Sequence, residues 1–237
     1  MQQPDTAAGE REQRAERILD AAAELLIAWG YRRVAIDEVA RRAGVGKGTV
    51  YLHFSTKEAL FLTVLLRSHA AMGEQILAGM RADPAGILPS AAVRTAYLAL
   101  QEDPVMRAVL TRDVEVLGTL GHRGYAELGE FTRLRFATVE SWLALLREHG
   151  LLRTDTPADD QLHALFAVTL GYLVVDPLLP REPETAARAD MLAHTLRSTL
   201  EASADPEALG RAAPRSIELF RHLLDRAHEE IGRQKRI

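Results

Sequence analysis

The segment GVGKGT, residues 44–49, places three glycines, a lysine and a threonine within six positions. Backbone amides of a glycine-rich loop and a lysine ammonium bind phosphate, so this composition fits a nucleotide-binding loop. The same residues also fit a tight turn that opens a short helix, as in helix-turn-helix DNA-binding modules. The neighbouring elements must decide between a nucleotide-binding enzyme and a DNA-binding protein.

A Walker-type phosphate loop needs a buried strand before it and a first glycine five residues before the glycine-lysine pair. In this chain Arg41 occupies the position of that first glycine, and Gly48 follows Lys47. The preceding residues 36–43, IDEVARRA, have the apolar spacing of a helix with its arginines outside. This context disfavours the phosphate loop, and a nucleotide-kinase type of enzyme built on residues 46–49 is kept as the rival hypothesis.

The helix-turn-helix interpretation fits the same region better. The spacing predicts a helix over 36–43 that ends at Gly44, and a third helix over 46–54 with Val50 and Phe54 facing inward. Steps of about 100° per residue then place Gly48 and Leu52 furthest outward, with Thr49 and Tyr51 beside them. A glycine inside a helix costs about 1 kcal/mol relative to alanine, which suggests that bare backbone at Gly48 approaches a groove edge.

Two further helices flank this module. Ile18, Ala22, Leu25 and Trp29 lie on one face of a predicted helix that runs from about residue 11 to Gly30, while residues 1–10 are expected to be frayed. The sequence Ser-Thr-Lys-Glu at 55–58 is a capping box, which predicts the start of a long fourth helix that ends near residue 80.

The remainder of the chain is helical in pattern, with predicted helices near 91–101, 104–118, 125–149, 161–175, 186–202 and 213–232. The sequence therefore predicts an all-α fold. A helix-turn-helix DNA-binding domain is predicted over residues 11–60, with its motif at about 35–54. The long fourth helix is predicted to join it, without a flexible linker, to a second helical domain over 61–237.

Composition narrows the function classes. The chain has a net charge of −4 and no cysteine, which excludes disulfides and thiolate metal sites. Residues 1–60 carry nine basic and nine acidic side chains, but residues 41–57 carry four cations and no carboxylate, a local patch that could meet phosphate. The N-terminus does not resemble a signal peptide, and the longest apolar run, 164–175, falls short of the roughly 20 residues that cross a bilayer. We expect a cytoplasmic protein.

The segment AGVGKGTVYLHFSTKEAL, residues 43–60, resembles the signature of the TetR family of bacterial transcriptional regulators. The likeness continues through ILDAAAELLIAWGY at 18–31 and covers about the first 65 residues. It implies DNA contacts at Lys47, Thr49, Tyr51 and His53, and a phosphate contact at Lys57. Two departures are Ala35, where the family usually has threonine, and Gly46, where it often has serine, so that a side-chain cap and a phosphate contact are missing. We expect further DNA contacts at residues whose charge, bare backbone or apolar side chain suits phosphate or a base: Arg41, Arg42, Gly46, Gly48 and Leu52.

The resemblance also implies a homodimer in which the C-terminal domain, residues 61–237, is an effector-binding and dimerisation domain for a small-molecule effector. The segment 162–175 is apolar on nearly all sides, which favours burial in a dimer, with 216–231 as the partner helix, over burial in the core of one subunit. Candidate effector contacts lie on or near apolar helix faces and suggest a mostly apolar effector: His69, Met72, Tyr97, Met106, Phe131, Trp142 and Phe166.

No motif of a known catalytic or metal site occurs, and the eight histidines lack metal-type spacing. We therefore predict no enzyme activity, no cofactor, no metal and no membrane partner. The predicted function is a ligand-responsive repressor that binds a pseudo-palindromic double-stranded operator as a dimer. The alternatives are a regulator without a small-molecule effector, an activator, and the nucleotide-binding enzyme.

Overall fold

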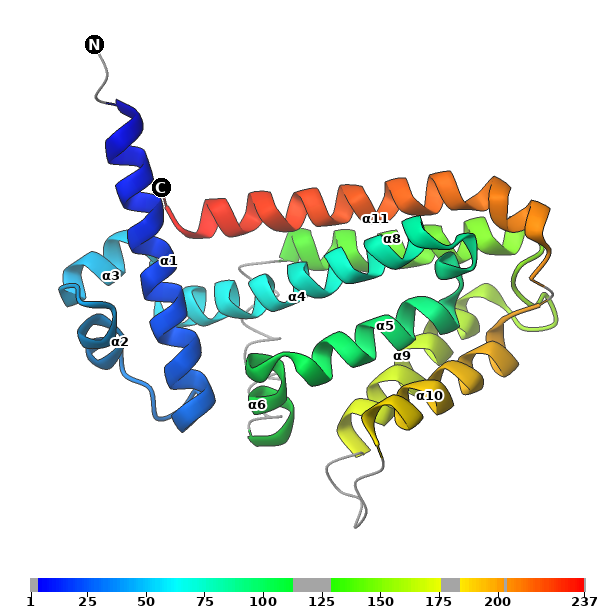
Figure 1. Cartoon of the computed structure of the whole chain (residues 1–237), viewed down its shortest axis with the longest axis horizontal. Coiled ribbons are helices and arrows are strands. Elements are labelled where there is room, and N and C mark those ends of the chain that lie inside the picture. The colour runs from blue at the N-terminus through cyan, green and yellow to red at the C-terminus, as the bar shows by residue number, and fades with distance from the viewer. Residues whose placement is uncertain (1–3, 113–128, 176–183, 203, 237) are drawn as a thin grey trace. The chain divides into compact units, whose positions relative to one another are not determined.

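The computed structural model describes residues 4–112, 129–175, 184–202 and 204–236 of the chain. Every regular element among these residues is a helix, apart from one isolated antiparallel bridge between Leu152 and Glu201 (Figure 1). The all-α prediction is confirmed. Residues 113–128, which include the predicted end of the helix that begins at Pro104, lie outside the described part.

The chain forms two compact units. The first contains the chain up to Ala70, residues from Asp103 to Phe131 and the stretch from Arg226 onward; the second contains Ala71–Glu102 and Thr132–Asp225. Helices α4 (Lys57–Ala82) and α11 (Pro206–Gln234) each contribute residues to both units. The first unit is therefore assembled from segments that are far apart in the sequence.

The first unit is built on α1 (Pro4–Trp29), against which α2 (Ile36–Ala43), α3 (Lys47–His53) and α6 (Pro104–Arg112) pack. Its core includes fully buried Ile18, Ala22, Val50, Phe54 and Leu60, as the helical spacing predicts. The predicted bounds of α2 are confirmed.

The turn between α2 and α3 depends on a left-handed residue. Gly44 has φ 68° and ψ 34°, a conformation that glycine adopts without the steric cost of a side chain. The amide of Val45 donates to the carbonyl of Ala40 over 3.0 Å, and the amide of Gly44 donates to Arg41 over 3.3 Å. These bonds satisfy carbonyls at the end of α2 and direct the chain into α3.

Three local predictions for this unit are wrong. Helix α1 begins at Pro4 rather than near residue 11, so most of the segment predicted to fray is helical. Trp29 is 45% exposed, because α1 ends at this residue and the chain turns at Gly30, whose φ is 76°. The cap of α4 is Thr56, whose hydroxyl accepts from the amide of Ala59 over 3.0 Å, and not Ser55.

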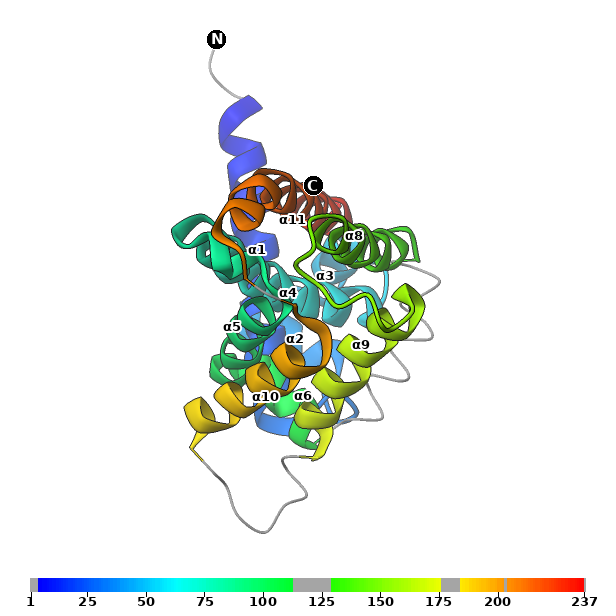
Figure 2. The same ribbon diagram turned by 90° about the vertical axis from the view of Figure 1, so that its right-hand side faces the viewer.

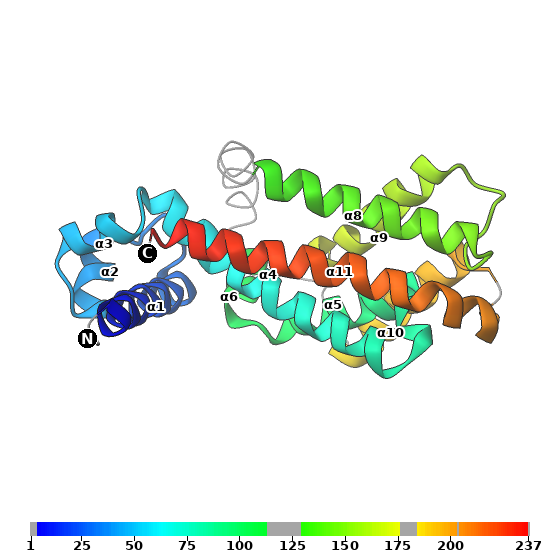
Figure 3. The ribbon, with the colours of Figure 1, turned by 90° about the horizontal axis from the view of Figure 1, so that it is seen from above.

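The second unit contains the end of α4, part of α11 and five further elements: η1 (Pro84–Ile87), a short 3-10 helix, and α5 (Pro89–Glu102), α8 (Gly129–Glu148), α9 (Ala158–Val175) and α10 (Thr185–Leu200). Figure 2 shows α5, α9 and α10 together, and Figure 3 shows α8 beside α11. The indole of Trp142 on α8 contacts Phe220 on α11 edge-on, with ring centroids 5.2 Å apart.

Two features of the second unit differ from the sequence patterns. Helix α11 begins at Pro206, seven residues before the predicted start, and continues through Pro214, a residue that usually marks a helix boundary. Helix α9 is apolar on nearly all sides, yet Leu170 is 55% exposed and Val175 is 46% exposed within one chain.

Candidate nucleic-acid interface

Helix α3 presents one buried face and one exposed face. Val50 is fully buried, whereas Leu52 is 74% exposed and Tyr51 is 42% exposed. Lys47 and Gly48 are exposed as well, and Thr49 is half-buried. This alternation is the one predicted from the helical period, and it leaves a cation, a hydroxyl group and an apolar side chain facing outward from a seven-residue helix.

The glycines of α3 are not required by packing inside the protein. A Cβ at Gly48 would have no neighbouring atom within 4 Å, and one at Gly46 would meet only the hydroxyl of Thr49 at 3.9 Å. The N-cap residues are Ala35 for α2 and Gly46 for α3, and neither provides a side-chain hydrogen bond to its helix. The missing cap that the departure at Ala35 implied is therefore observed.

Each predicted cation of α2 and the start of α3 has a carboxylate partner in the same unit. The pairs are Arg41 with Glu38 (Nε to Oε2, 3.1 Å), Arg42 with Glu24 (Nε to Oε2, 2.7 Å) and Lys47 with Asp37 (Nζ to Oδ2, 2.8 Å). All three carboxylates lie before residue 41 in the sequence, outside the window 41–57, whose charged side chains are all cations. The pair of Glu38 and Arg41 can be predicted from the sequence, because the two residues are three positions apart on one helix. The other two pairs join different helices and depend on the fold.

These ion pairs leave the three cations of the interface exposed. The hydrogen bond from Lys47 to Asp37 raises the pKa of Lys47, and the bond to Glu38 raises the pKa of Arg41. All three cations keep half or more of their side chains exposed. Exposed ion pairs contribute little to stability, so a phosphate oxygen can replace the carboxylate at small cost.

Lys57, at the start of α4, has a different environment. Its Nζ donates to the carbonyl of Tyr31 over 2.8 Å and lies 4.4 Å from the centroid of the Tyr31 ring, which itself contacts Phe61 edge-on. Burial lowers the pKa of Lys57. The ammonium thus ties α4 to the residues that follow α1, and its phosphate contact stays a prediction.

His53 requires a correction. Its side chain is 4% exposed, so it lacks the exposed surface that a phosphate contact needs. Its Nδ1 lies 3.4 Å from the carbonyl oxygen of Lys235, to which the Nδ1–H tautomer donates. Sequence spacing could not predict this contact because the two residues are 182 positions apart.

The candidate effector contacts are distributed over both units. Tyr97 and Trp142 of the second unit are buried, and the indole Nε1 of Trp142 donates to the carbonyl of Ile87 over 3.0 Å. Phe166, also in the second unit, packs against Phe136 with ring centroids 5.0 Å apart. The remaining candidates are Met106, which is buried, and His69, Met72 and Phe131, which are half-buried.

One polar residue that the sequence analysis did not single out is Ser216 of α11. It is fully buried, and its hydroxyl has no hydrogen-bond partner in the structure. It lies one helical turn before Phe220, the ring that contacts Trp142. A buried hydroxyl without a partner is unfavourable, so this position is a candidate contact for a bound molecule.

Among the described residues, no three or more histidine, aspartate or glutamate side chains gather as metal ligands would. None of the helices described is long and apolar enough to cross a membrane.

Comparison with known proteins identifies the helix-turn-helix region. The family of bacterial regulatory proteins named tetR matches residues 18–64. The transcriptional activator FasR of Mycolicibacterium smegmatis is 46% identical over 57 residues, which are 24% of this chain and 26% of FasR. The regulator TcmR of Streptomyces glaucescens is 29% identical over 208 residues, which are 87% of this chain and 82% of TcmR.

Solved structures agree on the fold. SmeT, the repressor of the Stenotrophomonas maltophilia multidrug efflux pump SmeDEF, is 20% identical, with a TM-score of 0.60 over 80% of this chain and 91% of SmeT. SmeT has also been solved in complex with triclosan. The first curated relatives, FasR and three further proteins, are each matched over 17–48% of their length, so their likeness concerns a part of each protein.

Proposed function

We propose that this chain, a member of the TetR family of bacterial transcriptional regulators, is a repressor that binds a pseudo-palindromic operator as a homodimer and leaves it when a small molecule binds. The observation that carries this proposal is the exposed face of α3, where Lys47, Gly48 and Leu52 stand outward on a helix fixed by Val50 and Phe54. A helix of this kind reads base edges in the major groove.

The contacts divide into two classes. We propose that Lys47, Thr49 and Leu52 face the bases, since a lysine suits guanine, a hydroxyl suits several base edges and an apolar side chain suits the thymine methyl group. The phosphate contacts come from Arg41, Arg42, Lys57 and the hydroxyl of Tyr51, and Lys47 can reach a phosphate oxygen as well as a guanine edge. The exposed backbone at Gly46 and Gly48 lies near the groove edge. His53 supports α3 from behind. The two copies of α3 would lie about 34–36 Å apart, one turn of the duplex.

We assign residues 11–60 to DNA binding and residues 61–237 to effector binding and dimerisation. The stretch from Arg226 onward belongs to the same compact unit as the helix-turn-helix, so it assists the DNA-binding part. A chain of this kind acts by binding and not by catalysis, and it acts in the cytoplasm, where the operator is.

The effector is proposed to be a mostly apolar small molecule. The seven candidate contacts are largely aromatic or thioether side chains, and the SmeT complex with triclosan shows that a protein of this fold holds such a compound. In the second unit Phe166 and the adjoining Phe136 are half-buried and suit this contact better than Tyr97 and Trp142, which are buried in the core.

Dimerisation is proposed through α9 and α10, which pack against each other. Leu170 and Val175 on α9 and Met191 on α10 are large apolar side chains that one chain leaves about half exposed. The exposed residues of α11, by contrast, are mainly charged or polar, Arg215, Glu218, Arg221, His222 and Asp225 among them. The apolar surface therefore favours α10, and not the segment 216–231, as the partner of α9.

The test begins with DNA. The full chain is used to select bound sequences from a random pool, and the selected fragment is then used in band-shift assays. We expect a two-fold related sequence that is bound by two chains. Failure to enrich any sequence would remove the DNA-binding proposal.

Transcription in vitro from a promoter that overlaps the selected sequence separates repressor from activator. We expect less transcript when the protein is added; an increase would indicate an activator, as FasR is named. Recovery of transcript when apolar compounds are added would identify an effector, whereas no response to any compound favours a regulator without one.

The nucleotide-binding hypothesis has a specific observation against it. The residues directly before GVGKGT form α2, a helix and not the strand that a phosphate loop follows. An ATP titration of the protein, followed by calorimetry, is expected to show no heat of binding.

A further inference from the structure

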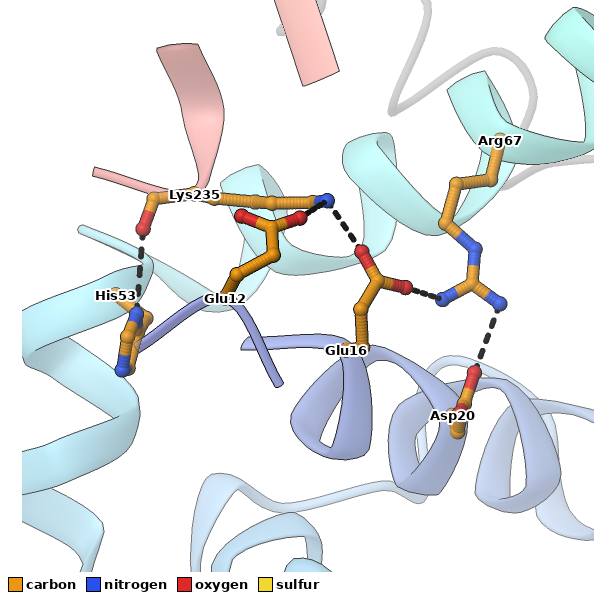
Figure 4. Close-up of polar contacts among 6 residues, drawn as sticks. All are labelled: Glu12, Glu16, Asp20, His53, Arg67 and Lys235. Carbon is orange, nitrogen blue, oxygen red and sulfur yellow. Dashed lines mark hydrogen bonds and ion pairs between the residues drawn. The ribbon is translucent and has the colours of Figure 1, made fainter. Parts of the chain in front are cut away.

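The ammonium of Lys235 is buried in the unit that holds the helix-turn-helix. Lys235 directly follows α11, and its side chain is 8% exposed. Its Nζ donates to Glu12 Oε1 over 2.5 Å and to Glu16 on the next turn of α1 (Figure 4). Burial alone would lower the pKa of Lys235, but the hydrogen bonds to the two carboxylates outweigh it and raise the pKa. This lysine is charged, and its ammonium is bound by two carboxylates of the protein itself.

The same carboxylates are shared with a second cation. Arg67 of α4 donates from Nη1 to Glu16 Oε2 over 3.0 Å and from Nη2 to Asp20 Oδ1 over 2.8 Å. Glu12, Glu16 and Asp20 stand at four-residue intervals on one face of α1, where like charges repel. Lys235 and Arg67 lie between them, so that signs alternate along the face (Figure 4). The position of α1 thus depends on one cation that follows α11 and one from α4.

The main chain of Lys235 reaches the DNA-reading helix. Its carbonyl oxygen faces Nδ1 of His53, the last residue of α3, at 3.4 Å. This hydrogen bond is long and therefore weak, but His53 is buried where it is made. One residue therefore holds α1 through its side chain and meets the end of α3 through its backbone.

We propose that Lys235 is a positioning residue for DNA recognition: it fixes α3 relative to α1, and so sets the orientation in which the exposed face of α3 meets the groove. The inference rests on the proposed function. Lys235 cannot contact phosphate itself, because its ammonium is buried and both of its carboxylate partners are in place. Only the lysine of this cluster is buried, since the carboxylates and Arg67 are 34–60% exposed. Ion pairs of this kind add little net stability, whereas their directional bonds favour one geometry.

The primary test compares two DNA affinities. Lys235→Met removes the charge and keeps the length of the side chain. We expect affinity for the selected operator fragment to fall about tenfold, the scale of a moderate coupling between sites, while affinity for an unrelated duplex of equal length changes less than about twofold. A residue that only stabilises the fold would lower the active fraction of the protein and leave the ratio of the two affinities unchanged.

Three further variants make the result specific. Lys235→Arg retains a cation that can pair with both glutamates and is expected to restore most of the operator affinity. Arg236→Gln is the matched control, because it removes one positive charge from the next residue, which is exposed. Glu12→Gln keeps the pair with Glu16 and is expected to lower operator affinity by a smaller factor, which also tests the proposal if Lys235→Met does not fold.

Each outcome has a definite meaning. If the unmodified protein selects no sequence, the proposed function fails before Lys235 is examined. If it selects an operator and the Lys235→Met and Glu12→Gln variants keep the same ratio of specific to unrelated affinity, the positioning role is overturned. Equal losses in Lys235→Met and Arg236→Gln would assign the effect to charge alone and would also overturn it.

Discussion

Gly48 is exposed on α3, and a methyl group at this position would contact nothing else in the protein. Gly48→Ala should therefore raise the free energy of unfolding by about 1 kcal/mol, the usual gain of alanine over glycine in a helix, as measured by urea denaturation. Operator affinity should fall in a band shift, because the added methyl group occupies space at the groove edge.

Gly210→Ala is the control for that substitution. Gly210 is also exposed in a helix with no neighbour within 4 Å of an added Cβ, but it lies in the second unit. It should gain stability without a change in DNA affinity. Undiminished binding by Gly48→Ala would show that the backbone of α3 does not come close to DNA.

Asp37 neutralises Lys47 in the protein without DNA. Asp37→Asn should strengthen binding to unrelated DNA at low salt and steepen the dependence of log affinity on log salt by about 1, because one more cation is available for phosphate. Asp155→Asn, which breaks the exposed pair with Arg153 in the second unit, should leave the slope unchanged. Identical slopes for both variants would mean that Lys47 does not meet phosphate.

Ser216 has a buried hydroxyl without a partner. Ser216→Ala should raise the free energy of unfolding by about 1 kcal/mol when no effector is present, because the alanine side chain has no polar group to desolvate. Thr63→Val serves for comparison, since the buried hydroxyl of Thr63 donates to the carbonyl of Ala59 over 2.7 Å and its removal should give no such gain. A loss of stability in Ser216→Ala would indicate a partner for the hydroxyl.

At the scale of the element, the end of α3 should respond to pH. Burial lowers the pKa of His53 from its ordinary value of 6.5, with Arg14 and Arg11 of α1 acting in the same direction and the carbonyl of Lys235 and Glu12 opposing them. A lowered folded-state pKa means that the native state disfavours the protonated ring. The associated stability is present above pH 6.5 and is lost as the pH falls through the folded-state pKa.

Urea unfolding at about pH 7.5 and about pH 5.5 measures this effect. The unmodified protein should lose more stability on acidification than His53→Gln, whose side chain does not titrate. His163→Gln, at an exposed position of α9, should behave like the unmodified protein. An equal pH response in all three proteins would contradict a buried neutral His53.

The helices themselves were largely predictable, because their signals are local. The bounds of α2 follow from apolar residues at helical spacing and from the left-handed Gly44. The start of α1 was missed because residues 4–10 are helical without an apolar face, and the cap of α4 was displaced from Ser55 to Thr56 because two hydroxyl residues are adjacent. Local patterns locate an element more reliably than its first residue.

Of the candidate nucleic-acid interface, only the outward-facing positions of α3 could be predicted from the sequence. Outward positions such as Leu52 follow from the helical period, but the burial of His53 and the carboxylate partner of Arg42 depend on residues distant in the sequence. No helical wheel contains that information. The polar cluster around Lys235 could not be predicted from the sequence either, because Lys235 lies more than 200 positions from Glu12 and Glu16.

At the scale of the whole molecule, the proposed dimer makes a clear prediction. Leu170→Glu and Met191→Glu place charge on the apolar surface of α9 and α10, which one chain leaves exposed. Each should shift the protein from dimer to monomer in light scattering and should weaken operator binding, because one α3 alone makes half of the contacts. Arg221→Glu, on the exposed face of α11, should remain dimeric. Dissociation of that variant instead would place the interface on α11.

The chain contains two tryptophans, and each compact unit has one of them. Trp29 of the first unit is 45% exposed, whereas Trp142 of the second unit is 2% exposed and hydrogen-bonded. Intrinsic fluorescence therefore offers a built-in reporter for each unit: a red-shifted, quencher-accessible emission at the end of α1 and a blue-shifted, shielded emission inside α8. With Trp142→Phe and Trp29→Phe as single-fluorophore versions, melting of the first unit and of the second unit can be followed separately without attaching any dye.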